Sequence, residues 1–330
     1  VARVKELGMN SVAITDHGVM YGVIDFYRAA KAAGIKPVLG CEVYVAPGSR
    51  FDKEAVGSGD DRYYHLVLLA ENDIGYHNLM KIVSRGFTEG YYYKPRVDIE
   101  VLQEFHEGII ALSACLAGEV QKNILRGMYE EGKAAALRYQ DIFGKGNFFL
   151  ELQDHGMQEQ QIVNQSLLRM AQETGIELVA TNDVHYTYAE DVKPHDILLC
   201  IQTGKKVTDE NRMRYTGGQY YLKSPEEMAE LFKYAPQALA NTEKIAKRIE
   251  EIAIELTNEL SVVETPGELD SVNKIFEIFS KMPYYTENPE DLFFVEIGDK
   301  LGRKSVVAVL RGKKSISKKH YCSNSIFWIG

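Results

Sequence analysis

Short apolar runs alternate with amphipathic helical stretches through the first 190 residues of the chain. The runs predicted as strands cover residues 11–15, 37–46, 64–70, 109–113, 147–153 and 177–181. Each is rich in Val, Ile, Leu or Phe and bounded by Gly, Asn or Asp, a pattern typical of a buried strand. Strands that alternate with helices favour parallel pairing through helical crossovers. The alternation therefore predicts an α/β fold, either a barrel or an open doubly wound sheet.

Side chains that bind metals lie in or beside five of these runs. In a barrel of parallel strands, side chains at the carboxyl ends converge on one rim. Such dispersed candidates favour the barrel over the open sheet, and the carboxylate and imidazole ligands among them together suit Zn²⁺, Mn²⁺ or Fe²⁺. The candidate ligands are His17, Glu42, His65, Cys115, Asp183 and His185.

Each of these residues also has an ordinary interpretation when it is taken alone. Glu42 could face water at a strand edge, and His65 could be a hydrogen-bonded core histidine. Cys115 could be a small buried apolar side chain. Asp183 and His185 could be a turn residue and a surface histidine. The sum of the six favours a metal site, with the pair Asp183 and His185 as the strongest local signal.

Other polar residues are candidates for supporting roles. Asp16 could orient the ring of His17, or it could cap the following helix. Glu151 and His155 follow another predicted strand and could orient ligands or face the substrate, or belong to an ordinary loop. Arg212 and Arg214, near a Gly-Gly pair, could contact a phosphate, although a solvated loop is the commoner use of such residues.

Composition excludes several classes of protein. The 330 residues hold no apolar run long enough to span a membrane, and no secretion signal is recognisable. The four cysteines form no CxxC pair, so we expect neither a zinc knuckle nor disulfides, and we expect the bacterial cytoplasm as location. The net charge is −9, and residues 301–330 carry seven basic and no acidic residues. An acidic body suits a metal site or a protein partner better than duplex DNA.

The pattern changes after residue 190. Helices are predicted at 190–201, 224–233 and 236–252, with a short strand at 219–222. Further on, residues 272–282 predict a helix, and 292–297 and 305–310 predict strands. We therefore expect one domain over residues 1–255 and a small α+β tail over residues 256–330.

Several segments resemble the PHP (polymerase and histidinol phosphatase) domain, in the version found at the N-terminus of bacterial DNA polymerase III alpha subunits. The segments that carry the resemblance are Ala13–Gly18, Gly40–Tyr44, His65–Ala70, Leu112–Glu119, Glu151–Gly156, Ala180–Tyr186 and Tyr220–Ser224. The resemblance covers about residues 1–250. It implies a distorted seven-stranded β/α barrel of the TIM-like type, with up to three divalent metal ions at one rim.

Carried over by position, the resemblance makes the six candidates above metal ligands. It implies a metal-dependent phosphoesterase or 3′→5′ exonuclease site, and DNA and replisome subunits as partners of the parent polymerase, with no membrane. Two alternatives stay open. The domain could be a non-catalytic module that docks the proofreading exonuclease subunit, or a free-standing enzyme similar to histidinol phosphatase.

The sequence departs from the family pattern at two places. The family opens with an H-x-H motif on a first strand, and nothing before Val1 matches it. We therefore expect an N-terminally truncated domain that lacks about three ligands. Residues 259–330 contain no paired aspartates of a polymerase palm, and Leu269–Met282 faintly resembles the C-terminal domain of the same subunit. The tail is thus a candidate remnant of that domain.

Overall fold

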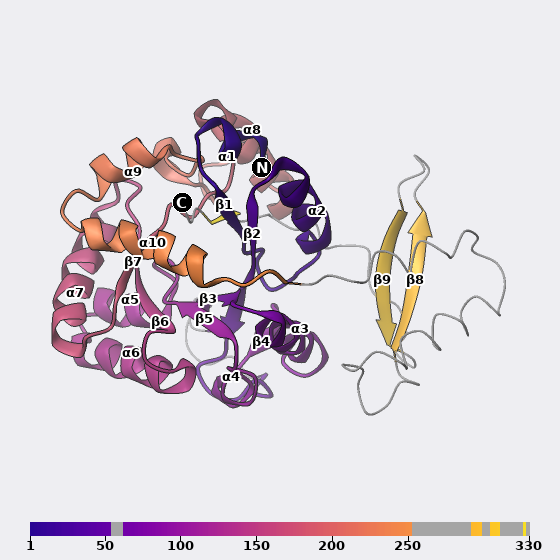
Figure 1. Cartoon of the computed structure of the whole chain (residues 1–330), viewed down its shortest axis with the longest axis horizontal. Coiled ribbons are helices and arrows are strands. Elements are labelled where there is room, and N and C mark those ends of the chain that lie inside the picture. The colour runs from indigo at the N-terminus through magenta and orange to yellow at the C-terminus, as the bar shows by residue number, and fades with distance from the viewer. Residues whose placement is uncertain (54–61, 253–291, 299–303, 311–325, 328–330) are drawn as a thin grey trace. The chain divides into compact units, whose positions relative to one another are not determined.

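The computed structural model describes residues 1–53, 62–252, 292–298, 304–310 and 326–327 (Figure 1). The chain divides into two compact units. The first comprises Val1–Ile252 and Tyr321–Gly330, and the second comprises Ala253–His320. All the predicted site residues belong to the first unit.

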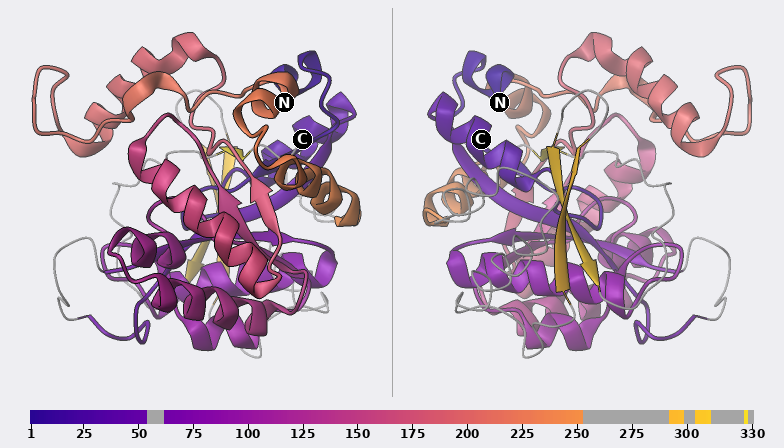
Figure 2. Two further views of the ribbon diagram at one scale, coloured as in Figure 1. Left: turned by 90° about the vertical axis from the view of Figure 1, so that its left-hand side faces the viewer. Right: turned by 90° about the vertical axis from the view of Figure 1, so that its right-hand side faces the viewer.

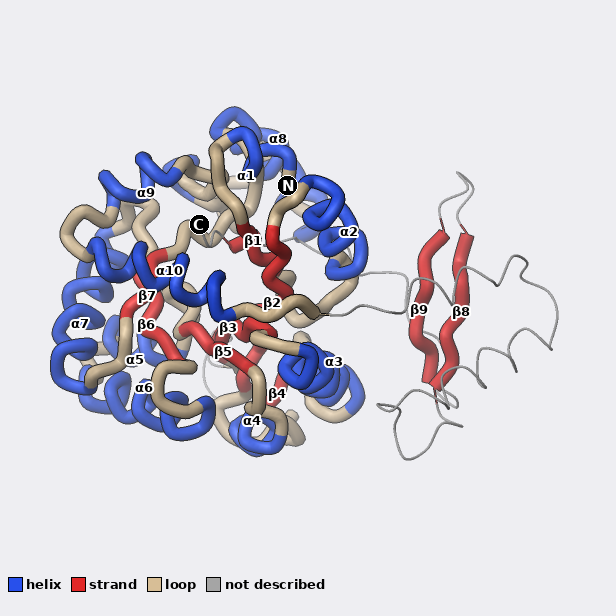
Figure 3. Tube along the Cα trace, viewed as in Figure 1, coloured by secondary structure: helices blue, strands red, loops and turns tan. Residues whose placement is uncertain are grey.

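The first unit is built on one curled sheet, which Figure 3 shows in red. Its order is β10-β1-β2-β3-β5-β6-β7, with β4 paired to β2 outside this path. The α/β, barrel-like fold expected from the sequence is confirmed. The strands are β1 (Ser11–Ile14), β2 (Lys36–Val45), β3 (Tyr64–Ala70), β4 (Arg96–Val97), β5 (Ile109–Leu112), β6 (Phe148–Leu152), β7 (Leu178–Ala180) and β10 (Ile326–Phe327).

Parallel pairing throughout, as the alternation predicted, is wrong for β3. This strand runs antiparallel to both β2 and β5, whereas β1–β2, β5–β6 and β6–β7 are parallel. The described residues between β2 and β3 include no helix, and a parallel pair needs a long crossover that an antiparallel pair does not. The reversal has a consequence for the site. It brings the first residues of β3 to the rim where the carboxyl ends of β2 and β5 lie.

Helices surround the sheet, and their ends follow from local sequence. Asn72 and Asp98 accept hydrogen bonds from backbone N–H groups of α3 and α4, and Ser224 with Glu227 forms a capping box on α9. Gly34, Gly175 and Gly204 end α2, α7 and α8 with positive φ angles. The helices are α1 (Ala2–Glu6), α2 (Val23–Ala33), α3 (Asp73–Thr88), α4 (Ile99–Glu104), α5 (Glu119–Leu125), α6 (Tyr129–Phe143), α7 (Gln158–Thr174), α8 (Val192–Thr203), α9 (Pro225–Leu231) and α10 (Pro236–Arg248).

None of the described helices has both the length and the apolar character needed to cross a bilayer.

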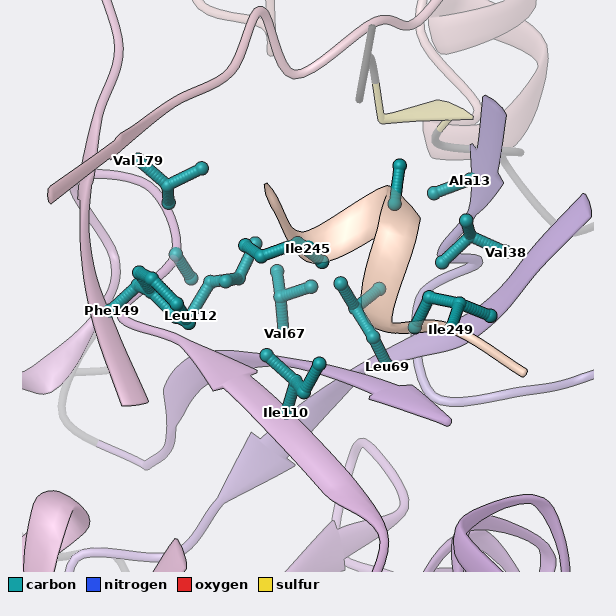
Figure 4. Close-up of a cluster of buried hydrophobic side chains, with 12 residues drawn as sticks. Ala13, Val38, Val67, Leu69, Ile110, Leu112, Phe149, Val179, Ile245 and Ile249 are labelled. Carbon is teal, nitrogen blue, oxygen red and sulfur yellow. The ribbon is translucent and has the colours of Figure 1, made fainter. Parts of the chain in front are cut away.

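The end of α10 packs on the inner face of the curled sheet, as Figure 4 shows. Ile245 and Ile249 are buried there against side chains from six strands. Figure 2 shows further helices on the outer side of the sheet. Because both faces of the strands are covered, their sequences read as continuous apolar runs. The strand residues of this cluster are Ala13, Val38, Val67, Leu69, Ile110, Leu112, Phe149 and Val179.

The described residues of the second unit form an antiparallel pair, β8 (Leu292–Gly298) and β9 (Lys304–Leu310). The strands predicted at 292–297 and 305–310 are confirmed. The helix predicted at 272–282 lies outside the described residues. Residues 326–327, for which no strand was predicted, pair as β10 with the edge of β1.

Candidate metal centre

His17, Glu42 and His65 form the most compact group of possible ligands. One ligand atom from each lies within 4.8 Å of the other two. The group is assembled by backbone pairing. His17 continues the β1–β2 ladder opposite Glu42, and on β3 His65 lies opposite Tyr44, two residues beyond Glu42. Two imidazoles and a carboxylate on adjacent strands are a ligand set that Zn²⁺ and Fe²⁺ accept.

The charge on Glu42 dominates this group. Its carboxylate is 1% exposed, with one oxygen 3.5 Å from His17 Nε2 and in ion-pair contact with His65 Nδ1. Burial alone would raise the pKa of Glu42, but the two imidazoles hold it well below its usual range. Burial would likewise lower the pKa of His17, but Glu42 raises it to about 9. In the absence of a cation, a proton on the His17 imidazole therefore offsets part of the charge of the buried Glu42 carboxylate.

Cys115 and His185 extend the group from other strand ends. Cys115 Sγ lies 3.5 Å from His65 Nδ1, and the rings of His17 and His185 are 5.9 Å apart between centroids. Burial lowers the pKa of His185 to about 4, so its ring is neutral at pH 7 and suited to bind a cation. Burial, followed by the charge of Glu42, raises the pKa of the Cys115 thiol.

Asp183 is close enough to the cluster to sense its charges. Burial, and next to it the charge of Glu42, raises the pKa of Asp183 to about 7, although His17 and His65 act in the opposite direction. Its Oδ1 lies 3.8 Å from His185 Nδ1. The structure thus brings all six predicted ligands to one rim.

Buried oxygens without a hydrogen-bond donor show that the residues fit a cation. Within the described part of the chain, Glu42 Oε2 and Asp183 Oδ1 are buried and accept no hydrogen bond. An unpaired buried carboxylate oxygen is costly. Divalent cations satisfy such oxygens, and carboxylates together with the imidazoles beside them suit Zn²⁺, Mn²⁺ or Fe²⁺.

Two turns at this rim have left-handed backbone at residues other than glycine. Ala114, which precedes Cys115, has φ +64°, and Asp183 itself has φ +43°. Such conformations cost on the order of 1–3 kcal/mol and persist only where their surroundings enforce them. Between the two turns lies Glu151 of β6, 2% exposed. Burial raises the pKa of Glu151, and the hydrogen bonds that Thr181 and Gln153 donate to its carboxylate act in the opposite direction by favouring the ionised form.

The remaining predicted residues have structural partners. Asp16 faces the start of α2, where the backbone of Gly22 donates to its carboxylate, and burial raises its pKa to about 6. Its Oδ1 is buried with no hydrogen-bond donor among the described residues. His155 uses both ring nitrogens, with Asn182 O at 2.9 Å and Gln160 Nε2 at 2.8 Å.

The two arginines form polar contacts on the segment that follows α8. Arg212 makes a bidentate ion pair with Asp196 of α8, at 2.5 and 2.7 Å. Arg214 donates to the carbonyl of Asp209 at 3.0 Å. Both contacts tie the segment together.

Sequence reasoning missed several aromatic and basic side chains around the rim. The ring centroid of Tyr215 lies 4.3 Å from that of His185, and the ring centroid of His195 lies 5.7 Å from that of His185. On the other side, the ring of Tyr44 lies 6.4 Å from that of His17, with Lys94 Nζ 5.3 Å from the Tyr44 centroid. Tyr215 and Lys94 come from irregular segments, which have no periodicity to signal their position.

Comparison with known proteins agrees with these findings. Residues 1–155 match the PHP domain family. The chain is 48% identical over 248 residues to the DNA polymerase III subunit alpha of Treponema pallidum, a match that covers 75% of this chain and 21% of that protein. It is 44% identical over 254 residues to the subunit of the same name in Borreliella burgdorferi, a match that covers 77% of this chain and 22% of that protein. It is also 42% identical over 240 residues to the DNA polymerase III subunit alpha of Thermus aquaticus, a match that covers 72% of this chain and 20% of that protein. The chain thus spans about a fifth of the length of these relatives.

Proposed function

We propose that this chain, whose residues 1–155 match the PHP domain family, carries a metal-dependent phosphoesterase site of the 3′→5′ exonuclease type. We further propose that it serves DNA replication, as the N-terminal module of a DNA polymerase III alpha subunit in the bacterial cytoplasm. The name and the identity of its relatives support this role.

The observation that carries the proposal is the convergence of six metal-binding side chains on one rim. His17, Glu42 and His65 would hold one cation. Cys115, Asp183 and His185 would complete the coordination or hold further cations, up to three in the complete domain. Unpaired buried oxygens on two of the carboxylates support this assignment.

The side chains around the rim suit a phosphate ester. A bound divalent metal supplies an activated water and neutralises charge on the phosphate. Lys94 places a positive charge near His17 and Tyr44. Tyr215, which is half-buried, offers an aromatic surface beside His185, and aromatic rings stack with the bases of single-stranded DNA. Arg212 and Arg214 remain proposed substrate contacts at the edge of this region.

The supporting polar residues would act on the ligands rather than on the substrate. Asp16 would fix the turn that carries the adjacent His17 through the hydrogen bond from the backbone of Gly22. The ring of His155 is held by hydrogen bonds with Gln160 and with the carbonyl of Asn182, the residue that precedes Asp183. DNA would reach the site through the parent polymerase, whose other subunits, including a proofreading exonuclease, are proposed partners.

The test uses the purified chain loaded with Mn²⁺ or Zn²⁺ and a single-stranded oligonucleotide labelled at its 5′ end. We expect shortening from the 3′ end, lost in His17→Ala and kept in His106→Ala, a matched histidine at the surface. Hydrolysis of histidinol phosphate without shortening of DNA would favour the free-standing phosphatase. Inactivity on both substrates would contradict the proposal and favour the docking module.

A further inference from the structure

We propose that Glu151 is a positioning residue whose buried carboxylate holds the two strained turns that present Cys115 and Asp183. The inference rests on the proposed function for the identity of the ligands. It assigns to β6, which contributes no ligand, the task of fixing ligands on both neighbouring strands.

The first contact is to the turn that carries Cys115. The backbone N–H of Ala114 donates to Glu151 Oε2 at 3.0 Å. Ala114 is 1% exposed and has φ +64°. Alanine has no polar side chain that could stabilise a left-handed conformation itself. The hydrogen bond to Glu151 therefore holds the backbone in the conformation that directs Cys115 toward His65.

The second contact is to the strand that leads to Asp183. Thr181 Oγ1 donates to Glu151 Oε1, and Thr181 is fully buried two residues before Asp183. Asp183 has φ +43°. One carboxylate thus links the ends of β5 and β7 through its two oxygens.

Glu151 is itself fixed in place. Its backbone N–H donates to Ser113 Oγ at 2.8 Å, and Gln121 Nε2 donates to the same oxygen and to Ala114 O. Gln153 Nε2 donates to Glu151 Oε1 at 2.9 Å. Three donors therefore converge on one carboxylate. A carboxylate can accept from all of them, whereas a glutamine side chain has one acceptor oxygen.

A small cavity adjoins this network. It has a volume of about 10 Å³ and is lined by Cys115, Gln121 and Glu151 among others. Removal of the Glu151 side chain would enlarge this space directly behind the Cys115 turn. The turn would then have room to relax toward ordinary backbone angles.

The test compares Glu151→Ala with Gln153→Ala, a matched control that removes a donor to the same carboxylate but leaves both turn contacts in place. Proteins are loaded with Co²⁺, and the thiolate-to-cobalt absorption band is measured per bound ion. We expect the band to fall by more than half in Glu151→Ala and to persist in the control. Glu151→Gln, which keeps one acceptor, should be intermediate.

A second variant separates positioning from general destabilisation. Glycine adopts positive φ without strain, so Ala114→Gly combined with Glu151→Ala should restore part of the band. If Glu151→Ala does not fold, Glu151→Gln with and without Ala114→Gly supplies the same comparison. An undiminished band in every folded Glu151 variant would overturn the inference.

A readout without metal keeps the two proposals distinguishable. Alkylation of Cys115 by iodoacetamide, followed by peptide mass spectrometry, reports the freedom of the turn in the metal-free protein. We expect a severalfold faster reaction in Glu151→Ala than in the wild type. Failure of the wild type to bind Co²⁺ would contradict the proposed function, whereas equal alkylation rates would contradict the positioning role of Glu151.

Discussion

The two halves of the rim hold their candidate ligands in different ways. On β2 and β3, Glu42 and His65 are part of a regular antiparallel ladder. At the ends of β5 and β7, Cys115 and Asp183 lie in turns that contain left-handed residues. The ladder positions side chains without strain, whereas the turns depend on the buried hydrogen bonds that Ala114 N–H and Thr181 Oγ1 donate to Glu151. The comparison shows how the same rim can be built from backbone pairing on one side and from side-chain contacts on the other.

The electrostatics of the two halves also differ. Glu42 is stabilised by two imidazoles, which hold its pKa below the usual range. Asp183 is destabilised by burial and by Glu42, which raise its pKa. In the metal-free protein, one carboxylate therefore contributes to stability and the other reduces it. This contrast can be tested by removing each charge.

The largest expected effect is on the ladder half. Glu42→Gln should lower the unfolding free energy of the metal-free protein by about 3–5 kcal/mol at pH 7. The substitution removes the buried negative charge with which the two imidazoles interact. Urea unfolding measures this change. Glu177→Gln, which breaks an exposed pair with Lys244, should cost less than about 1 kcal/mol. Equal effects of the two substitutions would contradict the role given to Glu42.

The next effect concerns His155, behind the turn half. Burial lowers the pKa of His155 from 6.5 to about 4. As the pH falls below 6.5, the unfolded chain takes up a proton that the folded chain refuses, so stability decreases until about pH 4. The loss is about 3 kcal/mol, at 1.36 kcal/mol for each pH unit. Unfolding of the metal-free wild type and His155→Gln between pH 7 and pH 4 checks this, and parallel pH profiles would refute it.

The opposite sign is expected for Asp183 in the turn half. Its pKa rises from 3.8 to about 7 on folding, so stability is lost as the pH rises from 3.8 through 7. Asp183→Asn should stabilise the metal-free protein by roughly 2 kcal/mol at pH 8, less than the full linkage because an amide would also be buried. The gain should vanish near pH 4. A loss of stability at pH 8 would remove the contrast with Glu42.

The smallest effect tests the strain in the turn. Ala114→Gly should raise the unfolding free energy by up to about 1 kcal/mol, since relief of the left-handed strain exceeds the greater freedom of glycine in the unfolded chain. Ala180→Gly, in regular strand β7, should lower it by about 1 kcal/mol or more. Thermal unfolding of both variants measures these changes in unfolding free energy. Destabilisation of the same size in both would show that Ala114 is not strained.

Much of the fold could be predicted from the sequence because its strands are buried on both faces. Continuous apolar runs ended at Gly, Asn or Asp, and β3 has the bounds that were predicted for it. The direction of β3 was predicted wrongly, because an apolar run does not show which way its strand runs and the alternation elsewhere favoured parallel pairing. The loop between β2 and β3, whose described residues form no helix, was the signal for the antiparallel direction. The resemblance to the PHP family supplied the ligand set, which single residues could not decide.

The environment of the site was harder to predict. His195 lies in helix α8 and gave no chemical signal, although it packs near His185. Tyr215 comes from an irregular segment whose course depends on tertiary contacts such as the Arg212–Asp196 pair. The left-handed turn at Ala114 had no signal at all, because alanine rarely adopts positive φ. These features arise from packing between distant segments.

Metal content is the most direct test of the claim that both halves form one metal centre. The wild type, Glu42→Gln and Asp183→Asn would be purified from metal-supplemented medium and measured by elemental analysis, with His106→Ala as control. The account predicts bound Zn, Mn or Fe in the wild type and in the control, and a metal content well below that of the wild type in both Glu42→Gln and Asp183→Asn. A metal-free wild type, or full occupancy in both variants, would contradict it.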